Sequence, residues 1–113
     1  MATSDRVCED VKLTVRVEHA GDGLMVSALG ELDLSNAKTL EAELRRAMDG
    51  DASEVILDLG CVEVIDSAGL RSVLRMANHS LRNGGRLRVR RGSPPLESAI
   101  EWGGLERLLP LVN

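Results

Sequence analysis

The stretch that decides the fold is Val55-Ile56-Leu57-Asp58-Leu59, followed by a link over residues 60–66 and then by Ser67-Ala68-Gly69-Leu70. The first five residues are almost continuously apolar, a pattern typical of a central strand covered on both faces. After Ser67, apolar residues recur at intervals of three and four, which predicts an amphipathic helix that ends at Asn83-Gly84-Gly85. A buried strand followed by a helix indicates an α/β fold.

The sequence before this stretch predicts a hairpin and a helix. Polar and apolar residues alternate over residues 13–17 and 24–28, and the glycine-containing segment 19–23 lies between them. This pattern predicts two antiparallel strands. A helical stripe follows over residues 37–48, preceded by Asp33 and Ser35 as candidate capping residues.

The sequence after it predicts one more strand and one more helix. Arginines alternate with apolar residues over 86–90, as in a strand with one solvated face of arginines. Ser93 followed by two prolines predicts the start of a third helix, which Gly103-Gly104 ends. Residues 105–112 fit either a last helical turn or a short edge strand.

These elements follow the order β-β-α-β-α-β-α plus a terminal element. We therefore expect one domain over residues 11–113, with a mixed sheet of four to five strands and helices packed on it. Residues 1–10 are polar and aperiodic and are expected to form a flexible N-terminal tail.

Composition argues against nucleic-acid binding. The 14 basic and 18 acidic residues give a formal net charge of −4, and the chain has one Trp with no Phe or Tyr. Proteins that bind nucleic acids usually carry a basic surplus, and those that bind single strands stack bases on aromatic rings. We therefore predict no direct nucleic-acid partner.

The same reading predicts a cytoplasmic protein without a membrane partner, metal or cofactor. No apolar run approaches the roughly 20 residues of a membrane span, and the first ten residues lack the apolar stretch of a signal peptide. The two cysteines, Cys8 and Cys61, are too few for a disulfide framework, although a redox-sensitive pair stays open. The two histidines and two cysteines show no metal-ligand spacing.

Ser67 is the candidate functional residue, and it has two interpretations. Its hydroxyl could cap the helix by accepting hydrogen bonds from the first-turn amides. It could also be exposed and be phosphorylated, because a helix N-terminus stabilises the added negative charge. Gly69 keeps the first turn slim, so that another protein could approach the hydroxyl.

Four groups of residues resemble a known family. They are Gly30-Glu31-Leu32-Asp33, the strand Val55-Ile56-Leu57-Asp58-Leu59, the box Ile65-Asp66-Ser67-Ala68-Gly69-Leu70, and Gly104-Leu105. In order and spacing, residues 11–112 resemble the STAS domain, and within it the bacterial anti-sigma factor antagonists.

The resemblance implies a binding module that is not an enzyme. In the family, the unmodified antagonist binds an anti-sigma factor that is also a serine kinase, and the sigma factor is released. The kinase phosphorylates the serine of the box, binding is lost, and a serine phosphatase restores it. Carried over, the phosphorylated residue is Ser67, and Ala68 stands where many relatives have a second serine. The implied partner-binding residues are Glu31, Asp33, Ser35, Asp66, Ser67, Ala68, Gly69, Leu70 and Arg71.

Other functions stay open as alternatives. A phosphorylation-independent STAS module could bind a nucleotide or lipid at residues 30–35 and 61–67, or could scaffold another signalling complex. A hydrolase would need a base beside Ser67, yet His79 lies twelve residues along the same helix, roughly 18 Å away at 1.5 Å per residue. Trp102 is predicted to pack in the core or at a hinge.

Overall fold

The computed structural model describes residues 5–112 of the 113-residue chain. Its strands are β1 (Arg6–Glu9), β2 (Leu13–Ala20), β3 (Gly23–Leu32), β4 (Val55–Ile65), β5 (Leu87–Arg90) and β6 (Leu111–Val112). Its helices are α1 (Ala37–Met48), α2 (Ser67–Arg82), α3 (Pro94–Gly103) and the short 3₁₀ helix η1 (Leu105–Arg107).

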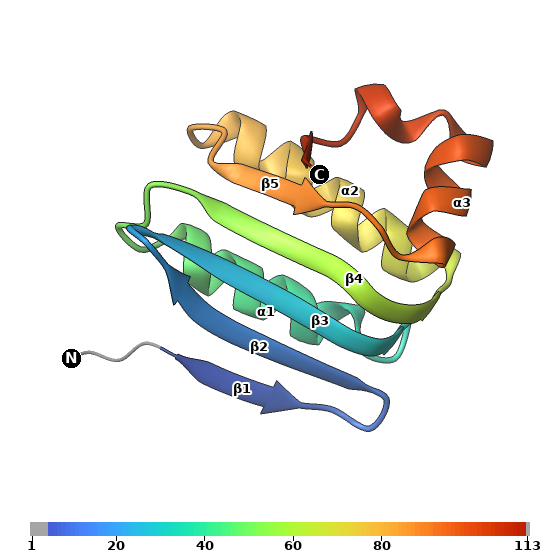
Figure 1. Cartoon of the computed structure of the whole chain (residues 1–113), viewed down its shortest axis with the longest axis horizontal. Coiled ribbons are helices and arrows are strands. Elements are labelled where there is room, and N and C mark those ends of the chain that lie inside the picture. The colour runs from blue at the N-terminus through green and yellow to red at the C-terminus, as the bar shows by residue number, and fades with distance from the viewer. Residues whose placement is uncertain (1–4, 113) are drawn as a thin grey trace.

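The strands form one mixed sheet in the order β1-β2-β3-β4-β5-β6. The pairs β1–β2 and β2–β3 are antiparallel, and the pairs from β3 to β6 are parallel. Helices α1 and α2 lie side by side on one face of this sheet (Figure 1). The predicted α/β class and mixed sheet are confirmed, with six strands in place of four to five.

β4 is the central strand, and it is longer than the sequence pattern predicted. Val55, Leu57 and Leu59 are fully buried, as expected of a strand covered by the helices. The predicted link over residues 60–66 is wrong for most of its length, because the ladder with β3 continues to Ile65 after a register shift. The irregularity breaks the apolar alternation, and this hid the second half of the strand.

The first strand, β1, falls within the segment predicted to be a flexible tail. Arg6–Glu9 pair with β2, with Cys8 opposite Val15, whereas residues 1–4 lie outside the described part of the chain. Arg6 also forms an ion pair with Glu43 of α1, with its Nε 3.0 Å from Oε1. Glu43 is only 5% exposed, although it is charged. This partly buried pair therefore attaches the edge strand to the helix.

The C-terminal part contains both structures that the sequence left open. Leu105–Arg107 form η1, and Leu111–Val112 form the edge strand β6. Ser93 caps α3 as predicted, since its Oγ accepts a hydrogen bond from the Leu96 amide. Trp102 was predicted to be a packing residue, and this is wrong because its side chain is 87% exposed.

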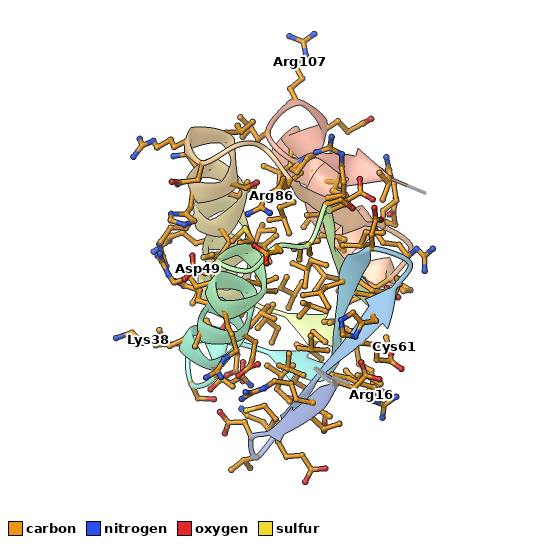
Figure 2. All side chains as sticks on the ribbon, turned by 90° about the vertical axis from the view of Figure 1, so that its left-hand side faces the viewer. Arg16, Lys38, Asp49, Cys61, Arg86 and Arg107 are labelled. Atoms are coloured by element: carbon orange, nitrogen blue, oxygen red, sulfur yellow. The ribbon has the colours of Figure 1, made fainter. Side chains whose placement is uncertain are left out.

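The arginines of the predicted basic run have two roles. Arg88 and Arg90 lie on the face of β5 away from the helices, near Glu54 and Asp58, which confirms the solvated face. Arg86 instead donates hydrogen bonds to the carbonyl oxygens of Met48, Gly50 and Ala52. Figure 2 shows it beside the C-terminal end of α1, where unpaired carbonyls favour a cation.

Candidate functional site

The hydroxyl of Ser67 lies at the first residue of α2 and is exposed to solvent. The cap of this helix is Asp66 and not Ser67. Asp66 has an extended backbone, and its Oδ1 accepts a hydrogen bond from the Gly69 amide at 2.7 Å. Because the neighbouring carboxylate does the capping, none of the hydrogen bonds within residues 5–112 engages the Ser67 hydroxyl. The prediction of Ser67 as the cap is therefore wrong.

Asp66 also connects two segments that are distant in the sequence. Its Oδ2 accepts a hydrogen bond from the Leu34 amide at 3.2 Å, and its own amide donates to the carbonyl of Leu32 at 3.2 Å. One side chain therefore fixes both the start of α2 and the loop between β3 and α1. The loop is thereby held beside Ser67.

A second carboxylate, Asp33, orders the same loop. Its Oδ1 accepts hydrogen bonds from the Ser35 hydroxyl at 2.6 Å and from the Ser35 amide at 2.9 Å. Its Oδ2 lies 2.6 Å from the Lys12 ammonium. The hydrogen bond from Lys12 and those from Ser35 lower the pKa of Asp33 from 3.8 to about 2. Asp33 and Ser35 were predicted to cap α1, but they form this turn and Asn36 precedes the helix.

A contact within the chain explains why position 69 is a glycine. A Cβ at this position would be 2.7 Å from the carbonyl oxygen of Leu32 and 2.9 Å from the Leu32 Cγ. Gly69 is also buried, so it faces β3 and not an approaching protein. The predicted role in giving a partner access to Ser67 is wrong, because the small residue allows α2 to begin against the end of β3.

Three exposed apolar side chains lie at this end of the sheet. Val11 is 94% exposed, Leu34 is 78% exposed and Val64 is 49% exposed. Val11 precedes Lys12, which pairs with Asp33, and Val64 lies opposite Glu31 in the β3–β4 ladder. We call the group formed by Val11, Leu34, Val64 and Ser67 the switch surface. None of its apolar members belongs to the hydrophobic core.

The predicted site residues divide into those that reach this surface and those that do not. Glu31, Asp33, Ser35, Asp66 and Ser67 lie on the two segments that Asp66 joins. Leu70 is half-buried against the core, while Arg71 is exposed one turn further along α2. A hollow of about 150 Å³ between the first turns of α1 and α2 is lined by Leu34, Ala37, Lys38, Glu41, Ala68, Arg71 and Arg75.

Sequence reasoning missed Val11, Lys12, Leu34 and Val64. Each is an ordinary residue of an exposed segment, and no local pattern distinguishes it from other surface positions. The hairpin prediction could have brought Lys12 to the end of β3, because the first hairpin strand begins opposite the last residues of the second. The pairing of Leu13 with Gly30 shows this geometry.

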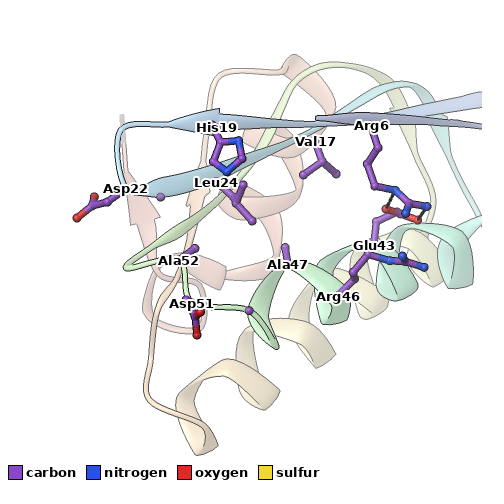
Figure 3. Close-up of a pocket in the computed structure, with 12 residues that line it drawn as sticks. Arg6, Val17, His19, Asp22, Leu24, Glu43, Arg46, Ala47, Asp51 and Ala52 are labelled. Atoms are coloured by element: carbon purple, nitrogen blue, oxygen red, sulfur yellow. Dashed lines mark hydrogen bonds and ion pairs between the residues drawn. The ribbon is translucent and has the colours of Figure 1, made fainter. Parts of the chain in front are cut away.

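A larger hollow of about 460 Å³ lies at the opposite end of the sheet (Figure 3). It is lined by apolar residues, among them Val17, Leu24, Ala47 and Ala52, and by the Arg6–Glu43 pair. β4 runs for 11 residues between the two ends, or roughly 33 Å at 3.3 Å per residue. This hollow is therefore separate from the switch surface.

Two kinds of feature are absent from residues 5–112. No group of three or more His, Cys, Asp or Glu side chains is arranged to hold a metal ion. No helix in this part of the chain is both long enough and apolar enough to cross a membrane.

Known structures share this architecture. An anti-sigma factor antagonist from Mycobacterium paratuberculosis is 26% identical, with a TM-score of 0.76 over 88% of this chain and 84% of that one. SpoIIAA, described as an anti-sigma factor antagonist and a Bacillus cell fate determinant, is 20% identical. Its unphosphorylated form gives a TM-score of 0.68 over 88% of both chains. Its phosphorylated form gives 0.65 over 88% of this chain and 91% of that one. The fold is therefore the α/β fold that these structures share.

Sequence comparison identifies the family. The family model described as "Mlab, STAS domain" matches residues 15–112. BtrV of Bordetella bronchiseptica, named as a candidate anti-sigma factor antagonist, is 36% identical over 93 residues, which are 81% of this chain and 80% of BtrV. The chain belongs to the STAS domain family, and the predicted resemblance is confirmed.

Proposed function

We propose that this protein is a cytoplasmic anti-sigma factor antagonist whose binding to an anti-sigma factor is controlled by phosphorylation of Ser67. The observation that carries the proposal is the exposed hydroxyl of Ser67, held on a fixed helix start and left without a hydrogen-bond partner among residues 5–112. The names of BtrV and of the Mycobacterium paratuberculosis antagonist support the class of partner. That SpoIIAA has been solved in a phosphorylated form supports the kind of modification.

The partner docks on the switch surface in the unmodified state. Val11, Leu34 and Val64 supply exposed apolar area at the end of the sheet that also carries the small neutral hydroxyl of Ser67. Burying such area stabilises a complex by about 25 cal/mol per Å², provided that no unpaired charge is buried with it. The anti-sigma factor held in this way releases its sigma factor for transcription.

Phosphorylation reverses docking by a change in charge. The anti-sigma kinase transfers the γ-phosphoryl group of ATP to the Ser67 oxygen, a new O–P bond replaces the bond to ADP, and a base of the kinase takes the hydroxyl proton. The product carries a charge of about −1.5 to −2 beside Asp66. Desolvating this group against an apolar partner costs several times the roughly 1.4 kcal/mol that changes an affinity tenfold.

A serine phosphatase completes the cycle. Water attacks the phosphorus, inorganic phosphate leaves, and the hydroxyl is restored. Because Ser67 is exposed in the folded protein, neither enzyme needs the domain to unfold. The domain itself is a substrate in both steps and contributes no catalytic residue.

The test begins with intact-mass analysis after incubation with the anti-sigma factor kinase of the same genome and ATP. We expect one phosphate, mapped to Ser67 by fragmentation. Binding of that kinase is then measured by calorimetry. Ser67→Ala should bind as tightly as the unmodified protein whether or not ATP has been added, and Ser67→Glu should bind at least tenfold more weakly.

Ser53 offers a matched control, since it is an exposed serine just before β4, at the opposite end of this strand from Ser67. Ser53→Glu introduces the same charge there and should leave the affinity unchanged. Equal affinities for the unmodified protein, Ser67→Ala and Ser67→Glu would overturn the proposal. No phosphate uptake with any candidate kinase would instead favour a phosphorylation-independent STAS module.

A further inference from the structure

Arg71 lies one helical turn beyond Ser67 on α2 and is exposed. Residues four apart on a helix are neighbours, with Cβ atoms about 5–6 Å apart. An anion that precedes a cation at this spacing is the favourable orientation, because it also matches the helix dipole. The Ser67 oxygen and the Arg71 guanidinium are therefore within reach of each other.

Two of the cations near this site, Arg75 and Lys12, are already paired. Arg75 already pairs with Glu41, with its Nη1 2.7 Å from the carboxylate Oε2. Lys12 already pairs with Asp33. Within residues 5–112, Arg71 forms neither an ion pair nor a side-chain hydrogen bond. It is therefore a cation beside Ser67 that no carboxylate within residues 5–112 engages.

The carboxylate nearest to Ser67 is also committed. Both oxygens of Asp66 accept backbone hydrogen bonds, from the amides of Gly69 and Leu34. Asp66 cannot turn away from a phosphate on Ser67 without losing these bonds, so its repulsion of that phosphate is fixed. A mobile cation within reach offsets this repulsion.

We propose that Arg71 is the intramolecular counter-ion of phosphorylated Ser67. In the unmodified protein its guanidinium borders the hollow formed with Leu34 and Ala68 and is available to an acidic group of the docking partner. A phosphate on Ser67 draws the guanidinium to itself by charge-assisted hydrogen bonds. Modification thus adds a negative charge to the surface and also withdraws the positive charge that a partner would use.

This inference rests on the proposed phosphorylation of Ser67, but its first test does not need the kinase. Phosphoserine is installed at position 67 during synthesis of the full chain, and the phosphate is titrated by ³¹P NMR. The second pKa of the phosphate, near 6 in an isolated group, should be about 0.3 unit lower with Arg71 than in the Arg71→Gln variant. Arg71→Lys should retain part of this shift.

Arg82 provides a control with the same change in net charge. It is exposed at the last residue of α2, about 22 Å from Ser67 at 1.5 Å per residue and beyond the screening length of physiological salt. Arg82→Gln should leave the phosphate pKa unchanged. Equal pKa values in the original chain and in Arg71→Gln would overturn the inference and leave the proposed function standing.

The second test measures docking of the unmodified chain. With the anti-sigma factor kinase of the same genome as the probe, Arg71→Gln should weaken binding about fivefold at low salt, and the loss should shrink as salt is added. An unchanged affinity would overturn the partner-binding half of the inference. If the kinase binds neither the original chain nor Ser67→Ala, the proposed function fails, while the ³¹P titration still decides whether Arg71 pairs with the phosphate.

Discussion

Asp66 shows how a single side chain places the candidate modification site. It caps α2 through one carboxylate oxygen and holds the β3–α1 loop through the other. The Ser67 hydroxyl is free because its neighbour has taken the capping role that a serine at a helix start often performs. The geometry of the site therefore depends on a residue that need not touch the partner.

Position 69 is the position of this site that is most restricted in residue type. We predict that Gly69→Ala lowers the free energy of unfolding by about 1–2 kcal/mol, because the added Cβ would meet the Leu32 backbone oxygen at 2.7 Å. Helix propensity alone favours alanine by up to about 1 kcal/mol, so the overpacking has to exceed that gain. Urea denaturation measures the difference.

Gly50→Ala is the comparison for this prediction. A Cβ at Gly50 meets nothing closer than the Ala47 oxygen at 3.7 Å, so its effect should stay within about 0.5 kcal/mol. A Gly69→Ala protein that is as stable as the Gly50→Ala protein would show that the start of α2 can move away from β3.

The Lys12–Asp33 pair predicts a change at acid pH. The pKa of Asp33 in the folded protein, about 2, lies below its ordinary value of 3.8. The ionised carboxylate therefore stabilises the folded state above about pH 4, and this stabilisation is lost as the pH falls towards 2. In Lys12→Gln the Asp33 pKa should rise towards 3.8. The carboxyl carbon chemical shift of Asp33, followed by NMR from pH 1.5 to pH 6 (roughly), measures both values. A titration midpoint unaffected by the variant would exclude the pair in solution.

At the scale of elements, the sequence predicted those whose burial pattern is regular. Burial alternates over residues 13–17 of β2 and 25–29 of β3, and α1 and α2 carry clear apolar stripes, so their positions followed from periodicity. β1 could not be found in this way, because it is a short edge strand with a burial pattern of half-buried and exposed residues. Its place depends on pairing with β2 and on a contact between Arg6 and Glu43, which are 37 residues apart.

The Arg6–Glu43 pair gives a prediction for this edge strand. Arg6→Ala leaves the buried Glu43 carboxylate without its cation, and we expect a loss of about 1–3 kcal/mol in the free energy of unfolding. This is less than for a fully buried pair, because the Arg6 side chain is 39% exposed and screened by solvent. Urea denaturation and hydrogen exchange of the β1 amides report the change.

Two variants separate this pair from general charge effects. Arg16→Ala removes an exposed cation from the outer face of β2 and should change stability little. Arg6→Met combined with Glu43→Leu removes both charges and should recover most of the loss. If Arg6→Ala behaves like Arg16→Ala, β1 is not attached through this pair.

At the scale of the whole molecule, the strand order determines whether the two cysteines can form a disulfide. Cys8 lies on β1 opposite Val15, and Cys61 lies on β4 opposite Leu29, so three strand spacings of about 4.8 Å separate them. A disulfide requires Cα atoms within about 7 Å. The possible redox pair within one chain is therefore contradicted by the fold, and both thiols are free.

We predict that the chain, after exposure to an oxidant and unfolding without a reductant, still has two thiols that can be alkylated. In the folded state Cys61, which is exposed on the outer face of the sheet (Figure 2), should react faster than the half-buried Cys8. Intact-mass analysis of the alkylated protein measures both. An intramolecular loss of two hydrogens would be incompatible with the six-stranded order.

The candidate site was predictable at Ser67 and only partly around it. The resemblance to the STAS domain located the serine, the neighbouring aspartate and the loop after β3. The apolar members of the switch surface could not be predicted, because exposure depends on which segments meet in space. Val11 and Val64 are distant in the sequence, and the order of β2, β3 and β4 places them at the same end of the sheet.

The switch surface draws on three separated segments, joined by Asp66 and by the Lys12–Asp33 contact. A cleaved or partly unfolded molecule would still carry a serine that a kinase can modify. It would lack the assembled surface to which an anti-sigma factor binds. If the proposed function holds, the size of the cell's response is proportional to the number of intact, folded molecules. Heat that melts a fraction of the population removes the same fraction of the response, with no enzyme involved.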